Sequence, residues 1–153
     1  MQTIFPILRY TDARAAIRWL CTAFDFREIF TVPETGQFVR HAQLSLSTNI
    51  ILLGSSRDDG LNSPQTLGAA TQALYVHVPG INEHFEKARL AGVEITGPPH
   101  DTDFGSRQYH LRDPEGHMWT FGTYFQTCSL DILYSPKGIR NPAQGCGPAA
   151  TLG

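Results

Sequence analysis

The sequence lacks any run of about 20 apolar residues, which is the length needed to cross a bilayer. Its N-terminus lacks the charged and apolar regions of a signal peptide, and no block of Lys or Arg accompanies the net charge of −2. These absences argue against a membrane protein, a secreted protein and a protein that binds nucleic acid. We therefore expect a cytoplasmic protein with no nucleic-acid or membrane partner.

Paired cysteines are also absent. The three cysteines, Cys21, Cys128 and Cys146, are odd in number, and none forms a Cys-x-x-Cys pair. A disulfide framework and a zinc knuckle are therefore not supported, and free thiols are expected. The sequence also has no glycine-rich phosphate loop and no Gly-x-Ser-x-Gly elbow, so two common catalytic motifs are excluded.

The most informative segment is residues 104–122, in which residues alternate as in a β-strand on both sides of Asp113-Pro-Glu-Gly. Proline presets φ for a turn and glycine accepts a positive φ, so these four residues are suited to reverse the chain. We expect two strands joined by a tight turn. Trp119 and Phe121 alternate with Thr120 and are expected to lie in the core beneath helices.

The rest of the chain predicts the order β-α-β-β-β twice. In the first half, strands are expected at residues 4–10, 26–32, 38–46 and 49–53, with a helix at 13–24. In the second half, strands are expected at 72–78 and 93–95, a helix at 81–91, and two further strands in the segment 104–122. The fold class is therefore α+β.

The two halves align at a constant offset of 68 residues, so that Phe5 matches Ala73 and Ile17 matches Phe85. One such unit cannot bury its sheet alone, whereas two can. We expect a domain at 1–125, with module one at 3–54, a linker at 55–71 and module two at 72–122. Residues 126–153, rich in proline and glycine, form a C-terminal extension.

This double order, together with Gly105-Ser-Arg and the segment Asp113-Pro-Glu-Gly-His-Met-Trp-Thr-Phe-Gly, resembles the vicinal-oxygen-chelate superfamily. That superfamily includes glyoxalase I, bleomycin resistance proteins and extradiol dioxygenases. The resemblance covers residues 3–125 and implies two tandem modules that form a curved, cup-like mixed sheet around a ligand site. It also implies a homodimer. Bleomycin-resistance-like members are the nearest in type.

Enzymes of this superfamily place metal ligands on the first and last strand of each module. Transferred to this sequence, those positions hold Phe5, Ala73 and Thr120, and the 68-residue offset places the fourth at Leu52. Metals used in this chemistry bind imidazole nitrogen or carboxylate oxygen. The resemblance therefore implies no metal and no cofactor at the usual site, which disfavours an enzyme that works by the family's route.

The cup would present aromatic and apolar side chains with a few polar groups, as small-molecule pockets usually do. The candidate ligand-binding residues are Phe5, Ile7, His41, Tyr75, His77, Arg107, Tyr109, Met118 and Thr120. For two strands, alternation does not show which set of residues faces the inside of the cup. Either Arg107, Tyr109 and Leu111 or Gln108 and His110 face inward, and either Phe38, Arg40 and Ala42 or Val39, His41 and Gln43 do. Arg107 is more readily explained by pairing with an acidic side chain than by a ligand anion.

The six histidines raise the question of a metal site elsewhere. His84, His100 and His117 are expected at the surface, whereas His41, His77 and His110 lie on strands where their side chains are free to converge. Three convergent imidazoles would bind zinc or iron.

Three hypotheses follow. The first is a metal-independent protein that binds a small planar, aromatic or antibiotic-like compound in the cup. The second is a superfamily lyase, isomerase or dioxygenase that uses a relocated metal site, or acid–base chemistry at His77 and Tyr75. The third is a non-catalytic interaction domain.

Overall fold

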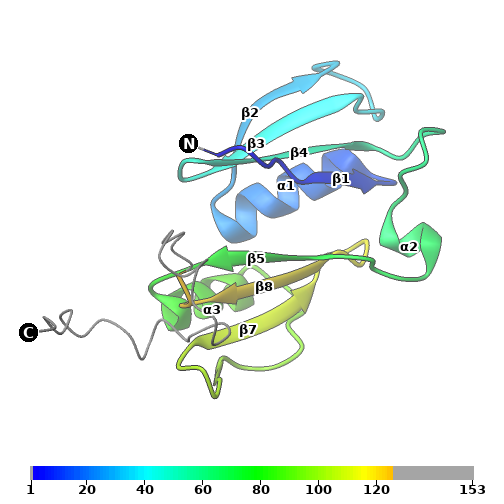
Figure 1. The fold of residues 1–153 in the computed structure, drawn as a ribbon. Helices are drawn as coiled ribbons and strands as arrows, with labels where there is room; N and C mark the ends of the chain where they lie inside the picture. Colours follow the sequence, from blue (N-terminus) through cyan, green and yellow to red (C-terminus); the bar gives the residue numbers. More distant parts are fainter. Residues whose placement is uncertain (1, 126–153) are drawn as a thin grey trace, which may run out of the picture.

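The computed structural model describes residues 2–125 and shows two modules in succession (Figure 1). Module one contains β1 (Ile7–Tyr10), α1 (Ala13–Phe24), β2 (Arg27–Val32), β3 (His41–Leu46) and β4 (Asn49–Ser55). Module two contains β5 (Ala73–His77), α3 (Ile81–Leu90), β6 (His100–Asp101), β7 (Arg107–Arg112) and β8 (Met118–Gly122). The expected extension at 126–153 lies outside the described residues. No helix in residues 2–125 is long and apolar enough to span a membrane.

The two modules have the same topology. Their strand orders are β1-β4-β3-β2 and β5-β8-β7-β6, and in each sheet the first strand runs parallel to the last. The α+β class and the double β-α-β-β-β order are confirmed. The strands form two four-stranded mixed sheets rather than one continuous sheet.

Helix α1 follows the apolar spacing of its sequence. Its buried residues share one face, namely Ala13, Ala16, Ile17, Leu20, Ala23 and Phe24. The carboxylate of Asp12 caps the first turn by accepting a hydrogen bond from the amide of Ala15 at 2.9 Å. The helix ends where Asp25 adopts a left-handed conformation, with φ of 61°.

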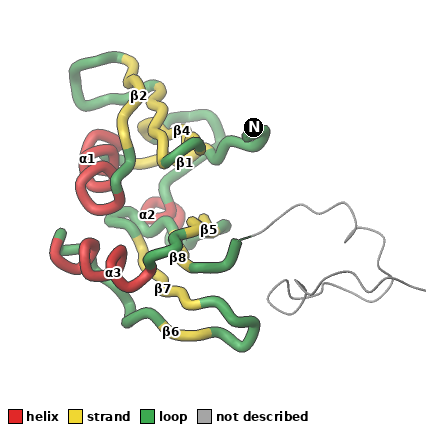
Figure 2. The backbone as a smooth tube through the Cα atoms, turned by 90° about the vertical axis from the view of Figure 1, so that its left-hand side faces the viewer, coloured by secondary structure: helices red, strands yellow, loops and turns green. Residues whose placement is uncertain are grey.

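Helices α1 and α3 lie on the same side of the two sheets (Figure 2) and contact each other. The ring of Phe24 on α1 stacks on Phe121 of β8, with centroids 4.7 Å apart, and Phe26 meets Trp119 edge-on. Trp119 and Phe121 are almost fully buried, which confirms their expected place in the core. The two modules therefore share one hydrophobic core.

Some elements differ from the sequence-based expectation. A short helix, α2 (Pro64–Leu67), lies in the segment expected to be a plain linker, and its N-cap is Ser63. Residues 93–95 form only an isolated bridge, Ile95 to Leu111, whereas β6 was not expected. These segments are too short for hydrophobic periodicity to identify them.

The turn between β7 and β8 contains a buried carboxylate. Asp113 is only 4% exposed, and its Oδ2 accepts hydrogen bonds from the Tyr10 hydroxyl at 2.7 Å and the Trp119 indole at 3.3 Å. Its second oxygen accepts from the amides of Glu115 and His117. Because Tyr10 belongs to module one, Asp113 joins the modules as well as shaping the turn.

A second carboxylate in this turn holds the start of α1. The Glu115 oxygens accept hydrogen bonds from the amides of Thr11 and Asp12 at 2.6 and 2.7 Å. Amides at a helix N-terminus lack partners within the helix, so module two satisfies donors that module one leaves free. The carbonyl of Glu115 also accepts from the Gln65 amide in α2.

We predict that Asp113→Asn lowers the free energy of unfolding by about 2–4 kcal/mol. The amide replaces one acceptor oxygen with an NH₂ group, and a hydrogen bond to a charged group is worth about 1.5–3 kcal/mol. Urea denaturation measures the change. Asp103→Asn, at an exposed loop position, is the control, and an equal loss in both variants would contradict this role.

The environment of Glu115 should make the stability of the fold depend on pH. Burial raises the pKa of the Glu115 carboxyl, but hydrogen bonds from Ser63 and from the Asp12 and Thr11 amides outweigh it, so the pKa lies below its usual 4.5. A lowered pKa stabilises the fold above the unfolded-state pKa, and this stabilisation is lost as the pH falls through the folded-state value.

Acidification should therefore remove the stability advantage of the wild type over Glu115→Gln. The gap in unfolding free energy should be largest at neutral pH and should shrink as the pH falls through the folded-state pKa, below which the carboxyl is protonated in both states. Chemical denaturation across this range tests it, with the exposed Glu34→Gln as the control. A gap that does not change with pH would refute the assignment.

Candidate functional site

Strand alternation leaves one face of each sheet uncovered. Leu8 and Tyr10 point toward the helices and are buried, whereas Ile7 points the other way and is 47% exposed. We call the face opposite the helices the open face. At its centre lie Ile7, Leu52 and Gln43 in module one and Tyr75, Thr120 and His110 in module two.

These six residues form two equivalent rows. Leu52 lies between Ile7 and Gln43, and Thr120 lies between Tyr75 and His110. Ile7 and Leu52 precede Tyr75 and Thr120 by 68 residues, which agrees with the offset inferred from sequence.

Two of the transferred ligand positions, Phe5 and Ala73, do not pair directly with Leu52 and Thr120. Phe5 precedes β1, and Ala73 pairs with Met118, so neither lies opposite Leu52 or Thr120. The residues in those places are Ile7 and Tyr75. None of the four positions holds an imidazole or a carboxylate, whichever register is used.

Hydrogen bonds link the polar groups of the open face. His110 Nδ1 and Thr120 Oγ1 share one at 2.8 Å, and Gln108 Nε2 lies 3.3 Å from His110 Nε2. A similar pair, Gln43 and His41, lies on β3 with 3.4 Å between the two nitrogens. Burial, and secondarily the nearby His100, lower the pKa of His110. Near neutral pH, His110 is therefore an uncharged hydrogen-bonding group.

Aromatic rings flank this polar centre. Tyr75 is 42% exposed, and its hydroxyl accepts from the Tyr124 amide at 2.8 Å. A Cβ on Gly122 would lie 2.5 Å from that hydroxyl oxygen, so glycine is required for the tyrosine to lie where it does. His77 packs edge-on against Phe125, with centroids 4.8 Å apart. The open face thus offers ring surfaces with a few polar groups between them.

Two predicted ligand residues lie on the opposite side of the sheet. Tyr109 is fully buried and shares a hydrogen bond with His84 at 2.8 Å, and Arg107 pairs with Asp101 and Asn82. The structure therefore selects Gln108 and His110 as the inward phase of β7, and His41 and Gln43 as that of β3. The prediction that Tyr109 and Arg107 face the cup was wrong. Both faces of β7 carry polar and apolar residues, so alternation alone does not show which face is turned to the cup.

The placement of the histidines does not favour a metal site. Within residues 2–125, no group of three or more His, Cys, Asp or Glu side chains is placed to hold a metal ion. His84 and His117, expected at the surface, are packed instead. His84 lies against Phe121, and His117 is 5% exposed and donates to the Arg9 carbonyl at 2.9 Å.

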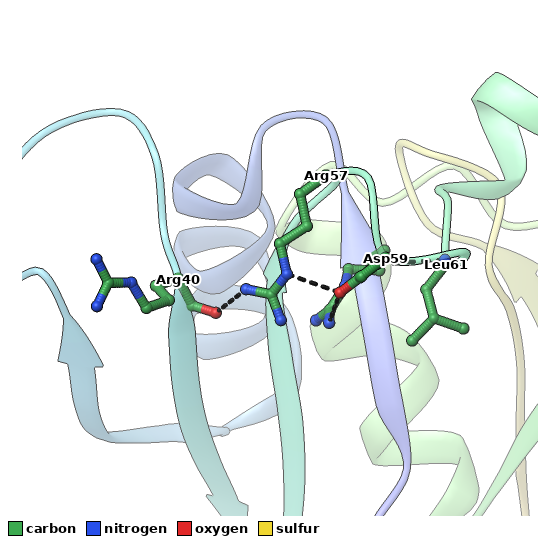
Figure 3. Close-up of polar contacts among 5 residues, drawn as sticks. Arg40, Arg57, Asp59 and Leu61 are labelled. Carbon is green, nitrogen blue, oxygen red and sulfur yellow. Dashed lines mark hydrogen bonds and ion pairs between the residues drawn. The ribbon is translucent and has the colours of Figure 1, made fainter.

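Sequence reasoning did not single out one charged cluster at the end of the open face. Arg9, on β1, is 8% exposed and pairs with Asp59 at 2.6 Å. Arg57 also pairs with Asp59 and donates to the Arg40 carbonyl (Figure 3). No motif marks the loop at 56–62, so only the alternation that places Arg9 beside Ile7 could have indicated this cluster.

A cavity of about 970 Å³ lies elsewhere. It is lined by Trp19 of α1, by several residues of the segments 64–70 and 92–96, and by the turn at 112–116. None of the predicted ligand residues lines it.

Comparison with known proteins identifies the family. The family model for the Glyoxalase/Bleomycin resistance protein/Dioxygenase superfamily matches residues 3–121. The crystal structure of TioX from Micromonospora sp. ML1 is 31% identical, with a TM-score of 0.68 over 82% of this chain and 100% of TioX. An uncharacterized protein of Mycobacterium tuberculosis is 26% identical over 132 residues, which are 84% of this chain and 78% of the relative.

A superfamily structure from Nocardioides shares the fold at 19% identity, with a TM-score of 0.57 over 82% of this chain and 85% of its own. The resemblance stated from the sequence is thus confirmed by a match that covers both modules. The chain belongs to the Glyoxalase/Bleomycin resistance protein/Dioxygenase superfamily.

Proposed function

We propose that this protein binds a small planar or aromatic molecule on the open face without the help of a metal ion. The observation that carries the proposal is the composition of the two central rows. On the first and last strands of each module, Ile7 pairs with Leu52 and Tyr75 pairs with Thr120. They supply apolar and aromatic surface and one hydroxyl.

The chemistry of this donor set disfavours a metal. Zn²⁺ and the other divalent ions of such sites take imidazole, thiolate or carboxylate ligands. A hydroxyl and a phenol do not replace them at neutral pH. The relocated site considered from sequence is also unsupported, because His41, His77 and His110 form no such group among the described residues.

Ligand binding follows from what the face exposes. A ring placed over Ile7 or over Tyr75 would remove apolar surface from water, worth about 2.5 kcal/mol for each 100 Å². His110 and Thr120 would orient the ligand through hydrogen bonds. Such a division between apolar area and a few polar groups suits a small molecule better than a protein surface.

We also propose the cytoplasmic location and the homodimer that the sequence and the resemblance suggest. Cell fractionation tests the location. Analytical ultracentrifugation of the full chain tests the dimer, and a single monomeric species at micromolar concentration would refute it.

We predict that the purified protein carries no stoichiometric Zn, Fe, Mn or Ni. The measurement is elemental analysis of protein expressed in metal-supplemented medium and freed of loosely bound ions by gel filtration. One equivalent of any of these metals per chain would overturn metal independence.

A second prediction concerns the apolar surface. In a screen of planar aromatic compounds, some should raise the melting temperature, because a ligand that binds only the folded state stabilises it. Ile7→Asn should weaken their binding about tenfold, which is about 1.4 kcal/mol. Leu90→Asn, at an exposed aliphatic residue on α3, is the matched control. Equal affinity of the two variants would exclude the open face.

A further inference from the structure

Arg9 is the most buried charged side chain on the open face. It is 8% exposed, it extends from the strand that also carries Ile7, and its carboxylate partner Asp59 comes from the loop after β4. Arg57 reaches the same carboxylate oxygen at 2.6 Å. Two guanidinium groups thus share one carboxylate, and the cluster retains a charge of +1.

The hydrogen bonds of this cluster are incomplete. Within residues 2–125, Arg9 Nε and Ser56 Oγ are buried with no hydrogen-bond partner. Buried polar groups are nearly always paired, so an unpaired guanidinium nitrogen suggests a missing partner. Asp59 accepts from Arg9 Nη2 and Arg57 Nε through the single oxygen Oδ2, while Oδ1 accepts from the Leu61 amide. It therefore does not form the two-oxygen contact that arginine and a carboxylate favour.

The neighbouring backbone makes room for this guanidinium. Arg9 pairs with Gly54 on β4, and a Cβ on Gly54 would lie 3.3 Å from Arg9 Nη1 and 3.0 Å from the Arg40 carbonyl oxygen. Residues two apart on a strand face the same side and lie about 6.6 Å apart. The Arg9 position is thus within the length of a bicyclic aromatic acid from Ile7.

We propose that Arg9 is the anchor for a carboxylate group on the ligand, and that Asp59 occupies this anchor in the unliganded protein. The proposal rests on the proposed function, because the rest of the ligand would lie on the open face. It specifies the ligand class as planar aromatic acids. The ligand carboxylate takes the place of the Asp59 carboxylate and contacts Arg9 through both Nε and Nη2.

Asp59 carries the charge that it needs to compete for the anchor. Hydrogen bonding from Arg9, followed in importance by that from Arg57, outweighs desolvation and lowers the pKa of Asp59 to about 2. It is therefore ionised throughout the neutral range. Arg57 remains available to hold Asp59 after displacement, so the loop keeps one of its two ion pairs.

The competition predicts the effect of removing the Asp59 charge. If the anchor is free in a tenth of the molecules or fewer, the apparent affinity for an acid is reduced at least about tenfold. Asp59→Asn should raise the affinity for acids by that factor and leave the affinity for neutral ligands unchanged. The adjacent and exposed Asp58 offers a matched control, because Asp58→Asn changes the net charge by the same amount.

The test is isothermal titration calorimetry with 2-naphthoate and its uncharged analogue 2-naphthamide. Asp59→Asn should bind 2-naphthoate about tenfold more tightly than the wild type, and Asp58→Asn should match the wild type. The affinity for 2-naphthamide should be the same in all three. Arg9→Met should bind both compounds alike, and circular dichroism checks that each variant is folded.

The outcomes separate this inference from the function on which it rests. If 2-naphthamide binds and 2-naphthoate binds no better in Asp59→Asn than in Asp58→Asn, the anchor is refuted and the aromatic site remains. If neither compound binds any of the folded variants, both the aromatic site and the anchor are refuted. Because Asp59→Asn leaves Arg9 intact, both outcomes can be measured even if Arg9→Met is unstable.

Discussion

The carboxylates of Asp113 and Glu115 connect the two modules where one β-turn meets the start of α1. Asp113 binds Tyr10 at the end of β1, and Glu115 binds the next two amides, those of Thr11 and Asp12. Without this contact the amides of Thr11 and Asp12, just before α1, would lose their carboxylate acceptor. The contact holds the start of α1, and Phe24 at the other end of this helix packs on Phe121.

The open face depends on the same contact. With α1 and α3 packed together on one side, the only uncovered surfaces of the two sheets, within the described part of the chain, lie opposite them (Figure 2). Arg9 links the two sides directly. Its carbonyl accepts from His117 in the buried turn, while its side chain reaches the charged cluster on the open face. The contact that joins the modules and the proposed anchor therefore involve adjacent residues on one short strand.

Much of the architecture was predictable because it depends on local patterns. The 68-residue offset identified Leu52 from Thr120, and the strand register confirms that these residues have equivalent places. The limits of α1 followed from its apolar spacing and from the Asp12 cap. The candidate site was less predictable. The alternation of β7 fits either face, so Tyr109 was assigned to the cup although it lies in the core.

The sequence by itself determined the order of elements, the internal repeat, the turn at Asp113-Pro-Glu-Gly and the absence of metal ligands at the four equivalent positions. Only the tertiary structure decided which phase of each strand faces the helices, because periodicity fixes relative and not absolute orientation. It also decided the burial of Asp113, Glu115 and His117. Polar residues next to a turn usually face water, and here their partners come from a module about 100 residues earlier in the chain.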